Sequence, residues 1–165
     1  MYKRQVHDDL FPVGRLDIDT EGLLLITNDG ALSHELLSPS KHVAKTYYAR
    51  IDGEVTWDDI IRFKEGIDIG EERPTKPAEL VIKKSGSVSE IELTITEGKF
   101  HQVKKMFLAV GRRVLRLKRV RIGGLELDKT LKEGECRELT KEELALIFQG
   151  ENRRFCEKKN SNGQI

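Results

Sequence analysis

Residues 87–111 read SVSEIELTITEGKFHQVKKMFLAVG, and within this stretch the apolar pattern changes its period. The apolar residues first alternate with polar ones and then recur every three or four positions: Ile91, Leu93, Ile95, Val103, Met106, Phe107 and Val110. The first pattern predicts a strand over Val88 to Thr96, and the second predicts a helix over His101 to Val110 that ends at Gly111. An antiparallel sheet with one covered face is therefore expected, in an α+β fold.

Similar patterns on both sides predict the remaining elements of a mixed, mainly antiparallel sheet with flanking helices. They are a buried strand over Leu23 to Thr27, a helix over Ala31 to Leu37, a strand over Lys45 to Ile51, a helix over Trp57 to Lys64, a hairpin arm over Glu79 to Lys83, a strand over Val114 to Ile122 and a last helix to about Phe148. Thr56 and Thr140 have the positions and side chains of helix N-caps. In the helix over Trp57 to Lys64, Trp57, Ile60 and Ile61 follow helical spacing.

Length and composition predict one soluble domain. The chain has 165 residues, of which 38% are hydrophobic and 35% charged. We expect a catalytic domain over residues 10–150, a disordered or artificial start over residues 1–9 and a flexible tail over residues 151–165. The absence of a secretory signal and of a long apolar run indicates a cytoplasmic protein. Cys136 and Cys156 have no metal-ligand spacing, so no metal site is expected.

The positive charge is concentrated in one part of the chain, although the formal net charge is only +1. No Asp or Glu occurs between Gly98 and Leu125, where nine basic residues lie: Lys99, Lys104, Lys105, Arg112, Arg113, Arg116, Lys118, Arg119 and Arg121. Such a segment is typical of a surface that contacts the phosphates of a nucleic acid. A solvated basic surface without a partner is the alternative.

Asp17 is the first candidate for chemistry, because it precedes a predicted buried strand and so lies in a loop beside the sheet. By itself this position is ambiguous. An Asp near a turn often accepts hydrogen bonds from neighbouring backbone amides, and Asp19 and Thr20 follow it closely.

A family resemblance favours the catalytic alternative. Residues 13–30 read VGRLDIDTEGLLLITNDG and resemble the central motif of the RNA pseudouridine synthases. Three later segments resemble further motifs of that family in the expected order: KTY at residues 45–47, EGKFHQVKKM at residues 97–106 and RVRIGGL at residues 119–125. Together with TKPA at residues 75–78, they are similar to the RsuA-like branch of the family, and within it to the enzymes of small-subunit (16S) ribosomal RNA. The similarity extends from Leu10 to Ile147.

The resemblance implies the pseudouridine synthase fold and an enzyme that isomerises a uridine of ribosomal RNA without a cofactor. Asp17 matches the family nucleophile, Tyr47 the tyrosine beside the target base, and Lys104 the cation that accompanies the aspartate. Such a cation is needed because burial disfavours the charged form of a carboxylate. The sequence does not choose between attack of the carboxylate on the sugar, attack on the base, and assistance of an elimination.

The target base must leave the RNA stack, and Arg15 is the candidate to fill the gap. The expected RNA contacts are Arg15, Lys45, Lys99, His101, Gln102, Lys105, Arg116 and Arg119. His101 and Gln102 are also expected to set the start of the helix that follows them. Tyr48 points away from Tyr47 on the predicted strand and is assigned to packing.

Two alternatives remain at this stage: a pseudouridine synthase for large-subunit (23S) ribosomal RNA, and a noncatalytic RNA-binding module. The family carries an S4-type RNA-binding domain before its catalytic domain, and no such segment precedes Asp17 here. We therefore expect an N-terminally truncated catalytic domain that acts as a monomer on ribosomal RNA or an assembling small subunit.

Overall fold

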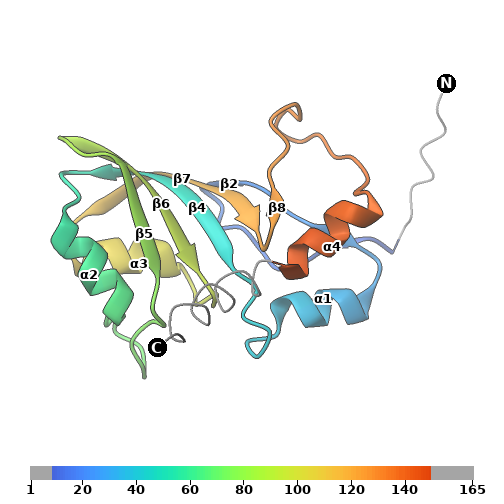
Figure 1. Ribbon diagram of the computed structural model, residues 1–165, viewed down its shortest axis with the longest axis horizontal. Coiled ribbons are helices and arrows are strands. Elements are labelled where there is room, and N and C mark those ends of the chain that lie inside the picture. Colours follow the sequence, from blue (N-terminus) through green and yellow to red (C-terminus); the bar gives the residue numbers. More distant parts are fainter. Residues whose placement is uncertain (1–8, 150–165) are drawn as a thin grey trace, which may run out of the picture.

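A six-stranded sheet organises the computed structural model, which describes residues 9–149 (Figure 1). The strand order is β2-β7-β4-β6-β5, and β8 pairs with β7. Strand β2 runs parallel to β7, and the other pairs are antiparallel. The strands are β2 (Thr20–Gly22), β4 (Lys45–Asp52), β5 (Glu79–Lys84), β6 (Val88–Ile95), β7 (Arg113–Ile122) and β8 (Leu125–Glu126).

A small second sheet and the helices complete the described part of the chain. Strand β1 (Phe11–Pro12) pairs with β3 (Ile26–Thr27) in an antiparallel arrangement. The helices are α1 (Gly30–Leu37), α2 (Trp57–Glu65), α3 (Gln102–Ala109) and α4 (Lys141–Gln149). The predicted α+β class and mainly antiparallel sheet are thus confirmed. The predicted start at residues 1–8 and the tail at residues 151–165 lie outside the described residues.

The predicted buried strand over Leu23 to Thr27 is wrong, because only Ile26–Thr27 of this run is extended, as β3, and the three leucines before it belong to no strand. The preceding strand β2 ends at Gly22, whose φ is +113° and whose α-carbon packs against the backbone of Arg119. Leu25 is buried, whereas Ile26 is 53% exposed. An apolar run alone does not reveal that its residues belong to different layers.

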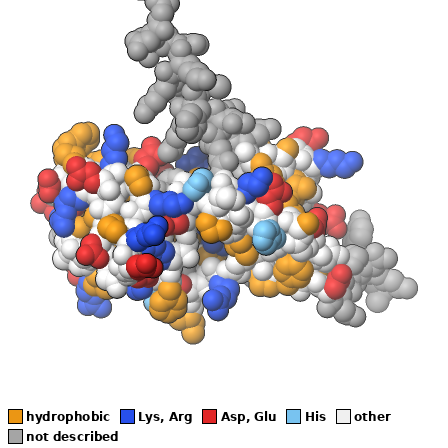
Figure 2. Space-filling view, turned by 90° about the horizontal axis from the view of Figure 1, so that it is seen from below, with side chains coloured by type: hydrophobic (Ala, Val, Ile, Leu, Met, Phe, Trp, Pro, Cys, Tyr) orange, Lys and Arg blue, Asp and Glu red, His pale blue; other side chains and the backbone are white. Residues whose placement is uncertain are grey.

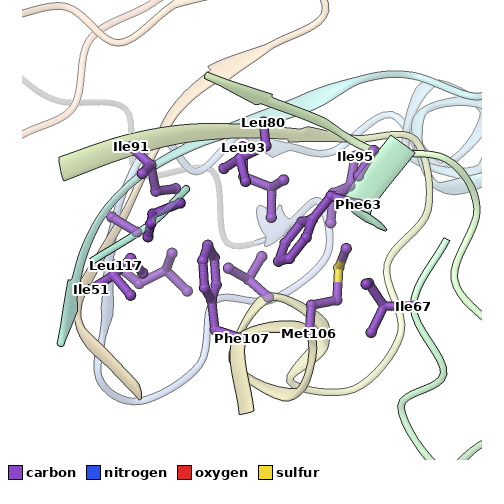
Figure 3. Packing of buried hydrophobic residues seen from close by; sticks show 14 residues of the cluster. Ile51, Phe63, Ile67, Leu80, Ile91, Leu93, Ile95, Met106, Phe107 and Leu117 are labelled. Carbon is purple, nitrogen blue, oxygen red and sulfur yellow. The ribbon is translucent and has the colours of Figure 1, made fainter. Parts of the chain in front are cut away.

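The larger core lies between the sheet and helices α2 and α3, which lie along one face of it (Figures 1 and 3). The rings of Phe63 and Phe107 meet there with centroids 5.0 Å apart, a distance typical of favourable aromatic contacts. The helical spacing of Trp57, Ile60 and Ile61 predicts an apolar face on α2, and this prediction is partly wrong. Phe63 is fully buried, while Trp57, the first residue of α2, is 72% exposed.

A second core surrounds the small sheet and contains Leu36 of α1, Ile122 of β7 and Ile147 of α4. Helix α4 begins with the predicted cap. The amide of Glu143 donates to the Thr140 hydroxyl at 3.1 Å, and the amide of Thr140 donates to the Glu143 carboxylate at 2.9 Å. None of the helices in residues 9–149 is long and apolar enough to cross a membrane.

Candidate functional site

Asp17 lies in the loop that leads into β2, at the edge of the large sheet. The carbonyl of Asp17 accepts from the amide of Thr20 at 2.9 Å, so a turn places the residue just before the strand. Its side chain is 27% exposed and accepts no hydrogen bond from a neighbouring backbone amide within the described residues. The turn therefore uses the backbone of Asp17 and leaves the carboxylate free for other contacts.

Helix α3 supplies the cation that contacts this carboxylate. Nζ of Lys104 lies 3.0 Å from Oδ2 of Asp17, and the same ammonium donates to Oδ1 of Asp19. Burial opposes the charge of Lys104, but the hydrogen bonds to Asp19 and Asp17 outweigh it and raise the pKa of Lys104. The hydrogen bond from Lys104 lowers the pKa of Asp19. One lysine thus holds two carboxylates of the same loop, and Asp19 is a contact that sequence patterns did not indicate.

His101 stands on the other side of Asp17 in an unusual backbone conformation. It precedes α3 with a φ of +51°, in the left-handed region that residues other than glycine rarely adopt. Its Nε2 lies 3.7 Å from Oδ1 of Asp17, and its ring stacks on Phe100 with centroids 3.7 Å apart. The expectation that His101 sets the start of the helix is confirmed.

Tyr47 comes from β4, on the sheet face that α3 covers. It is half-buried, packs against the larger core and pairs in register with Arg119 of β7. Arg119 also pairs with Gly22 of β2, the strand that follows Asp17. Strand β7 therefore lies between β2 on one side and Tyr47 of β4 on the other. The hydroxyl of Tyr47 forms no hydrogen bond with another described residue, although its backbone pairs within the sheet. The pairing therefore brings Tyr47 toward the Asp17 loop without joining the two side chains.

Tyr48 faces the opposite side of the sheet, as expected for its neighbour on a strand. There it lines a groove of about 440 Å³ together with Lys118 and Arg121. Asp17, Lys104 and His101 do not border this groove.

Two of the expected RNA contacts are buried and bind other parts of the protein. Gln102 is 3% exposed; its carbonyl accepts from the Lys99 amide at 3.0 Å and its amide donates to Glu97 at 2.8 Å. Arg119 is 4% exposed and its Nε donates to the carbonyl of Leu23 at 2.7 Å. In this conformation neither side chain reaches the surface, because each one fixes a segment beside the site.

Lys45 is partly buried, and its Nζ donates weakly to the carbonyl of Val43 at 3.4 Å. Loss of water around the side chain lowers the pKa of Lys45, and the nearby charge of Arg119 lowers it further. No carboxylate of the described residues pairs with Lys45. It is therefore a cation without a neutralising partner, on the strand that carries Tyr47.

Acidic side chains from other segments neutralise much of the basic segment. Five of its cations form ion pairs: Lys99 and Lys105 with Glu71, Lys104 with Asp17 and Asp19, Arg112 with Asp59, and Arg116 with Glu21. Seen from below, blue and red side chains are interspersed on the described surface (Figure 2). The basic segment is therefore partly neutralised within the fold, because tertiary contacts bring distant carboxylates onto these five residues.

Three of the expected RNA contacts have well-exposed side chains: Arg15, Arg116 and His101, the last with 40% exposed. Arg15 is exposed in the Asp17 loop and has no ion pair within the described residues. Arg116 is 53% exposed, and its Nη2 lies 2.6 Å from Oε1 of Glu21. The described residues contain no group of three or more His, Cys, Asp or Glu side chains arranged to hold a metal ion.

Comparison with known proteins identifies the family to which this arrangement belongs. Residues 1–109 match the family described as RNA pseudouridylate synthase. This match includes the Asp17 loop, Tyr47 and all of α3.

Two curated relatives are similar over most of the chain. An uncharacterized RNA pseudouridine synthase of Bacillus subtilis is 53% identical over 138 residues, which are 83% of this chain and 58% of the relative. The ribosomal small subunit pseudouridine synthase A of Escherichia coli K12 is 46% identical over 139 residues, 84% of this chain and 59% of the relative. The chain thus spans less than two thirds of each.

A solved structure agrees with this relationship. The crystal structure of a pseudouridylate synthase superposes with a TM-score of 0.83 at 42% identity, covering 88% of this chain and 63% of the other. The predicted pseudouridine synthase fold is therefore confirmed. Since the family match includes the loop, strand and helix that form the site, the chain belongs to the RNA pseudouridylate synthase family.

Proposed function

We propose that this protein converts a specific uridine of ribosomal RNA into pseudouridine, with Asp17 as the nucleophile. The observation that carries the proposal is the ion pair between Asp17 and Lys104, at the exposed edge of a sheet in a member of this family. A carboxylate that is fixed by a cation and still 27% exposed is accessible to a ligand and held in one orientation.

The reaction breaks the bond between C1′ of the ribose and N1 of uracil and forms a bond between C1′ and C5. The proton at C5 must leave, and N1 gains a proton, so the reaction is redox-neutral. Asp17 either forms a temporary covalent bond to the sugar or base, or assists removal of the C2′ proton. Lys104 neutralises the carboxylate in the resting site and orients it.

Tyr47 is proposed to stack against the target base and to take part in proton transfer at C5. Tyr47 lies on β4, directly next to β7, and on the sheet face covered by α3, which supports this role. Its hydroxyl is not engaged with another described residue, so it is available to a ligand.

RNA contact is proposed for the cations at the edge of the site. Arg15 would fill the gap left by the flipped uridine, and Arg116, Lys45, Lys99 and Lys105 would bind phosphates. For Lys99, Lys105 and Arg116 this requires RNA to replace the carboxylates with which they now pair. His101, which lies next to Asp17, is retained as a contact to RNA.

The substrate that we favour is small-subunit (16S) ribosomal RNA, and we expect a cytoplasmic monomer. The name of the Escherichia coli relative supports this choice, because that protein is a ribosomal small subunit pseudouridine synthase. A large-subunit synthase would have the same chemistry and a different stem-loop. A noncatalytic RNA-binding module is less favoured, since Asp17, Tyr47 and Lys104 are all present.

The test is to map pseudouridine in ribosomal RNA from cells that contain or lack the gene for this chain. One position of 16S RNA is expected to lose its modification in the deletion strain. The wild-type gene should restore it, and a gene encoding Asp17→Asn should not. An unchanged pseudouridine map in the deletion strain would contradict the proposal, and loss of a 23S position would identify the large-subunit alternative.

A further inference from the structure

Phe100 presents an unusual aromatic surface beside the site. It is 70% exposed. Its ring stacks on His101 with centroids 3.7 Å apart and an interplanar angle of 20°. His101 in turn lies 3.7 Å from Asp17, so an unbroken series of contacts connects the exposed ring to the candidate nucleophile.

The backbone holds this stack in a strained conformation. The left-handed φ of +51° at His101 is unfavourable for a residue other than glycine. The strained residue is the one that carries the ring between Phe100 and Asp17. Strained backbone of this kind is concentrated at ligand sites, which points to a function for the stack.

Two cations accompany the aromatic ring. Nζ of Lys105 lies 5.5 Å from the centroid of Phe100 and 3.0 Å from Oε1 of Glu71. Nζ of Lys99 lies 3.6 Å from the same carboxylate and donates to the carbonyl of Arg73 at 2.7 Å. Two ammonium groups therefore converge on the Glu71 carboxylate beside the ring. A phosphate oxygen has the same negative charge as this carboxylate.

We infer that Phe100 is a stacking site for an unpaired base of the RNA, adjacent in sequence to the target uridine. An exposed aromatic ring with nearby lysines is the combination by which proteins bind single-stranded RNA. The base on Phe100 is a neighbour and not the target, because the ring of His101 lies between Phe100 and Asp17. This inference rests on the proposed function, since it assigns a place to a nucleotide of that substrate.

The test is a double-mutant cycle between the protein and the RNA. The protein variant is Phe100→Leu, and the RNA is a synthetic hairpin around the modified uridine in which each flanking nucleotide is made abasic in turn. With the wild-type protein, one abasic position is expected to raise KM about 5-fold to 100-fold and to change kcat little, as expected for the loss of one stacked base. Phe100→Leu is expected to have a raised KM already with the intact hairpin, and the same abasic position is expected to raise this KM no further.

Controls separate stacking from general damage. Phe100→Tyr keeps the ring and is expected to restore the wild-type KM. Trp57→Leu removes another exposed aromatic residue, at the start of α2 and outside the described site, and should leave every value unchanged. The inference would be overturned if Phe100→Leu and every abasic position raised KM independently, so that their effects multiplied. An unchanged KM for Phe100→Leu would also overturn it.

The two proposals fail in different ways. If wild-type protein forms no pseudouridine in the intact hairpin, the proposed function fails. The same cycle is then scored by filter binding, which requires no turnover. Coupling between Phe100 and one flanking base in that assay supports the stacking site, and additive losses of affinity reject it.

Discussion

The ammonium of Lys104 lies 3.0 Å from Oδ2 of Asp17, although the two residues belong to segments far apart in the sequence. The loop before β2 provides the carboxylate, and α3, packed on the sheet, provides the cation. The same ammonium also contacts Asp19, so the charge of the lysine is shared between two carboxylates. The predictions below start from this arrangement.

Asp17→Asn is expected to abolish pseudouridine formation and to leave folding and RNA affinity nearly unchanged. Asparagine retains the volume and shape of the side chain and removes the charge and nucleophilicity. Turnover and binding are measured on the same preparation, from a strain without the wild-type gene.

Asp52→Asn is the matched control, because Asp52 is exposed at the end of β4 and has no ion pair within the described residues. Asp19 is unsuitable as a control because it contacts Lys104. Turnover by folded Asp17→Asn would end the assignment.

Lys104→Ala is expected to lower kcat by about 10²-fold to 10³-fold and to change RNA affinity little, since its charge acts on Asp17. Arg116→Ala should do the reverse and weaken binding with kcat nearly retained, because Arg116 is a largely exposed cation that pairs with Glu21 of the edge strand β2. Steady-state kinetics with filter binding distinguish the two. If Lys104→Ala loses affinity in step with activity, Lys104 is only a phosphate contact.

Gly22→Ala is expected to destabilise the protein by about 3 kcal/mol or more, because it combines a strained φ with a steric clash. A β-carbon at this position would lie 2.2 Å from the carbonyl oxygen of Arg119. Gly70→Ala is the matched control: its φ is +77°, but no atom lies within 4 Å of the added carbon. Thermal or urea unfolding should show a much larger loss for Gly22→Ala. Equal losses would mean that β2 can move away from β7 at little cost.

The cluster around Arg137 predicts a loss of stability in acid. Arg137 contacts Asp128 at 2.6 Å and Glu143 at 2.7 Å. Hydrogen bonds from Thr130, and then from Arg137, lower the pKa of Asp128 to about 2. Hydrogen bonds from Arg137, and then from the backbone of Thr140, lower the pKa of Glu143 to about 2. The ordinary pKa values are 3.8 and 4.5, so the unfolded chain binds protons first as the pH falls.

The contribution of this cluster is therefore complete above about pH 4.5 and lost as the pH falls toward 2. The protection factors of the α4 amides, which correct for the pH dependence of intrinsic exchange, should fall over this window in the wild-type protein. Arg137→Gln should already have lower protection factors in α4 at pH 7, and these should depend less on pH. Because the cluster is exposed, added salt should reduce the difference between the two proteins. The same acid response in both would show that Arg137 does not hold α4.

Activity is expected to persist in EDTA, because the proposed isomerisation is redox-neutral and uses a carboxylate, a lysine and a tyrosine. The assay is pseudouridine formation before and after dialysis against the chelator. Magnesium also folds RNA, so the control is a short hairpin whose structure is verified in EDTA. Loss of turnover with this hairpin, restored by a divalent cation, would show that the protein itself needs a metal.

Local patterns predicted most elements because the forces that select them act between neighbouring residues. The periods over residues 88–110 gave β6 and α3 within a few residues, and the side chains of Thr140 and Glu143 gave the start of α4. The predictions failed where a distant contact decides the outcome. Strand β2 ends at Gly22, which packs closely on Arg119, and the leucines after it form no strand, while Trp57 at the start of α2 is exposed.

For the site, the sequence by itself determined the chemical groups: the motif around Asp17, the KTY motif with Tyr47 and the EGKFHQVKKM motif with Lys104. Only the tertiary structure decided how their charges are used. Folding places Glu71 on Lys99 and Lys105, Glu21 on Arg116, and Asp19 on Lys104. The physical reason is that Coulomb interactions depend on distances in space, which a list of charges along the chain does not contain. A basic segment in the sequence thus became a set of ion pairs, with Asp17, His101 and the exposed ring of Phe100 side by side.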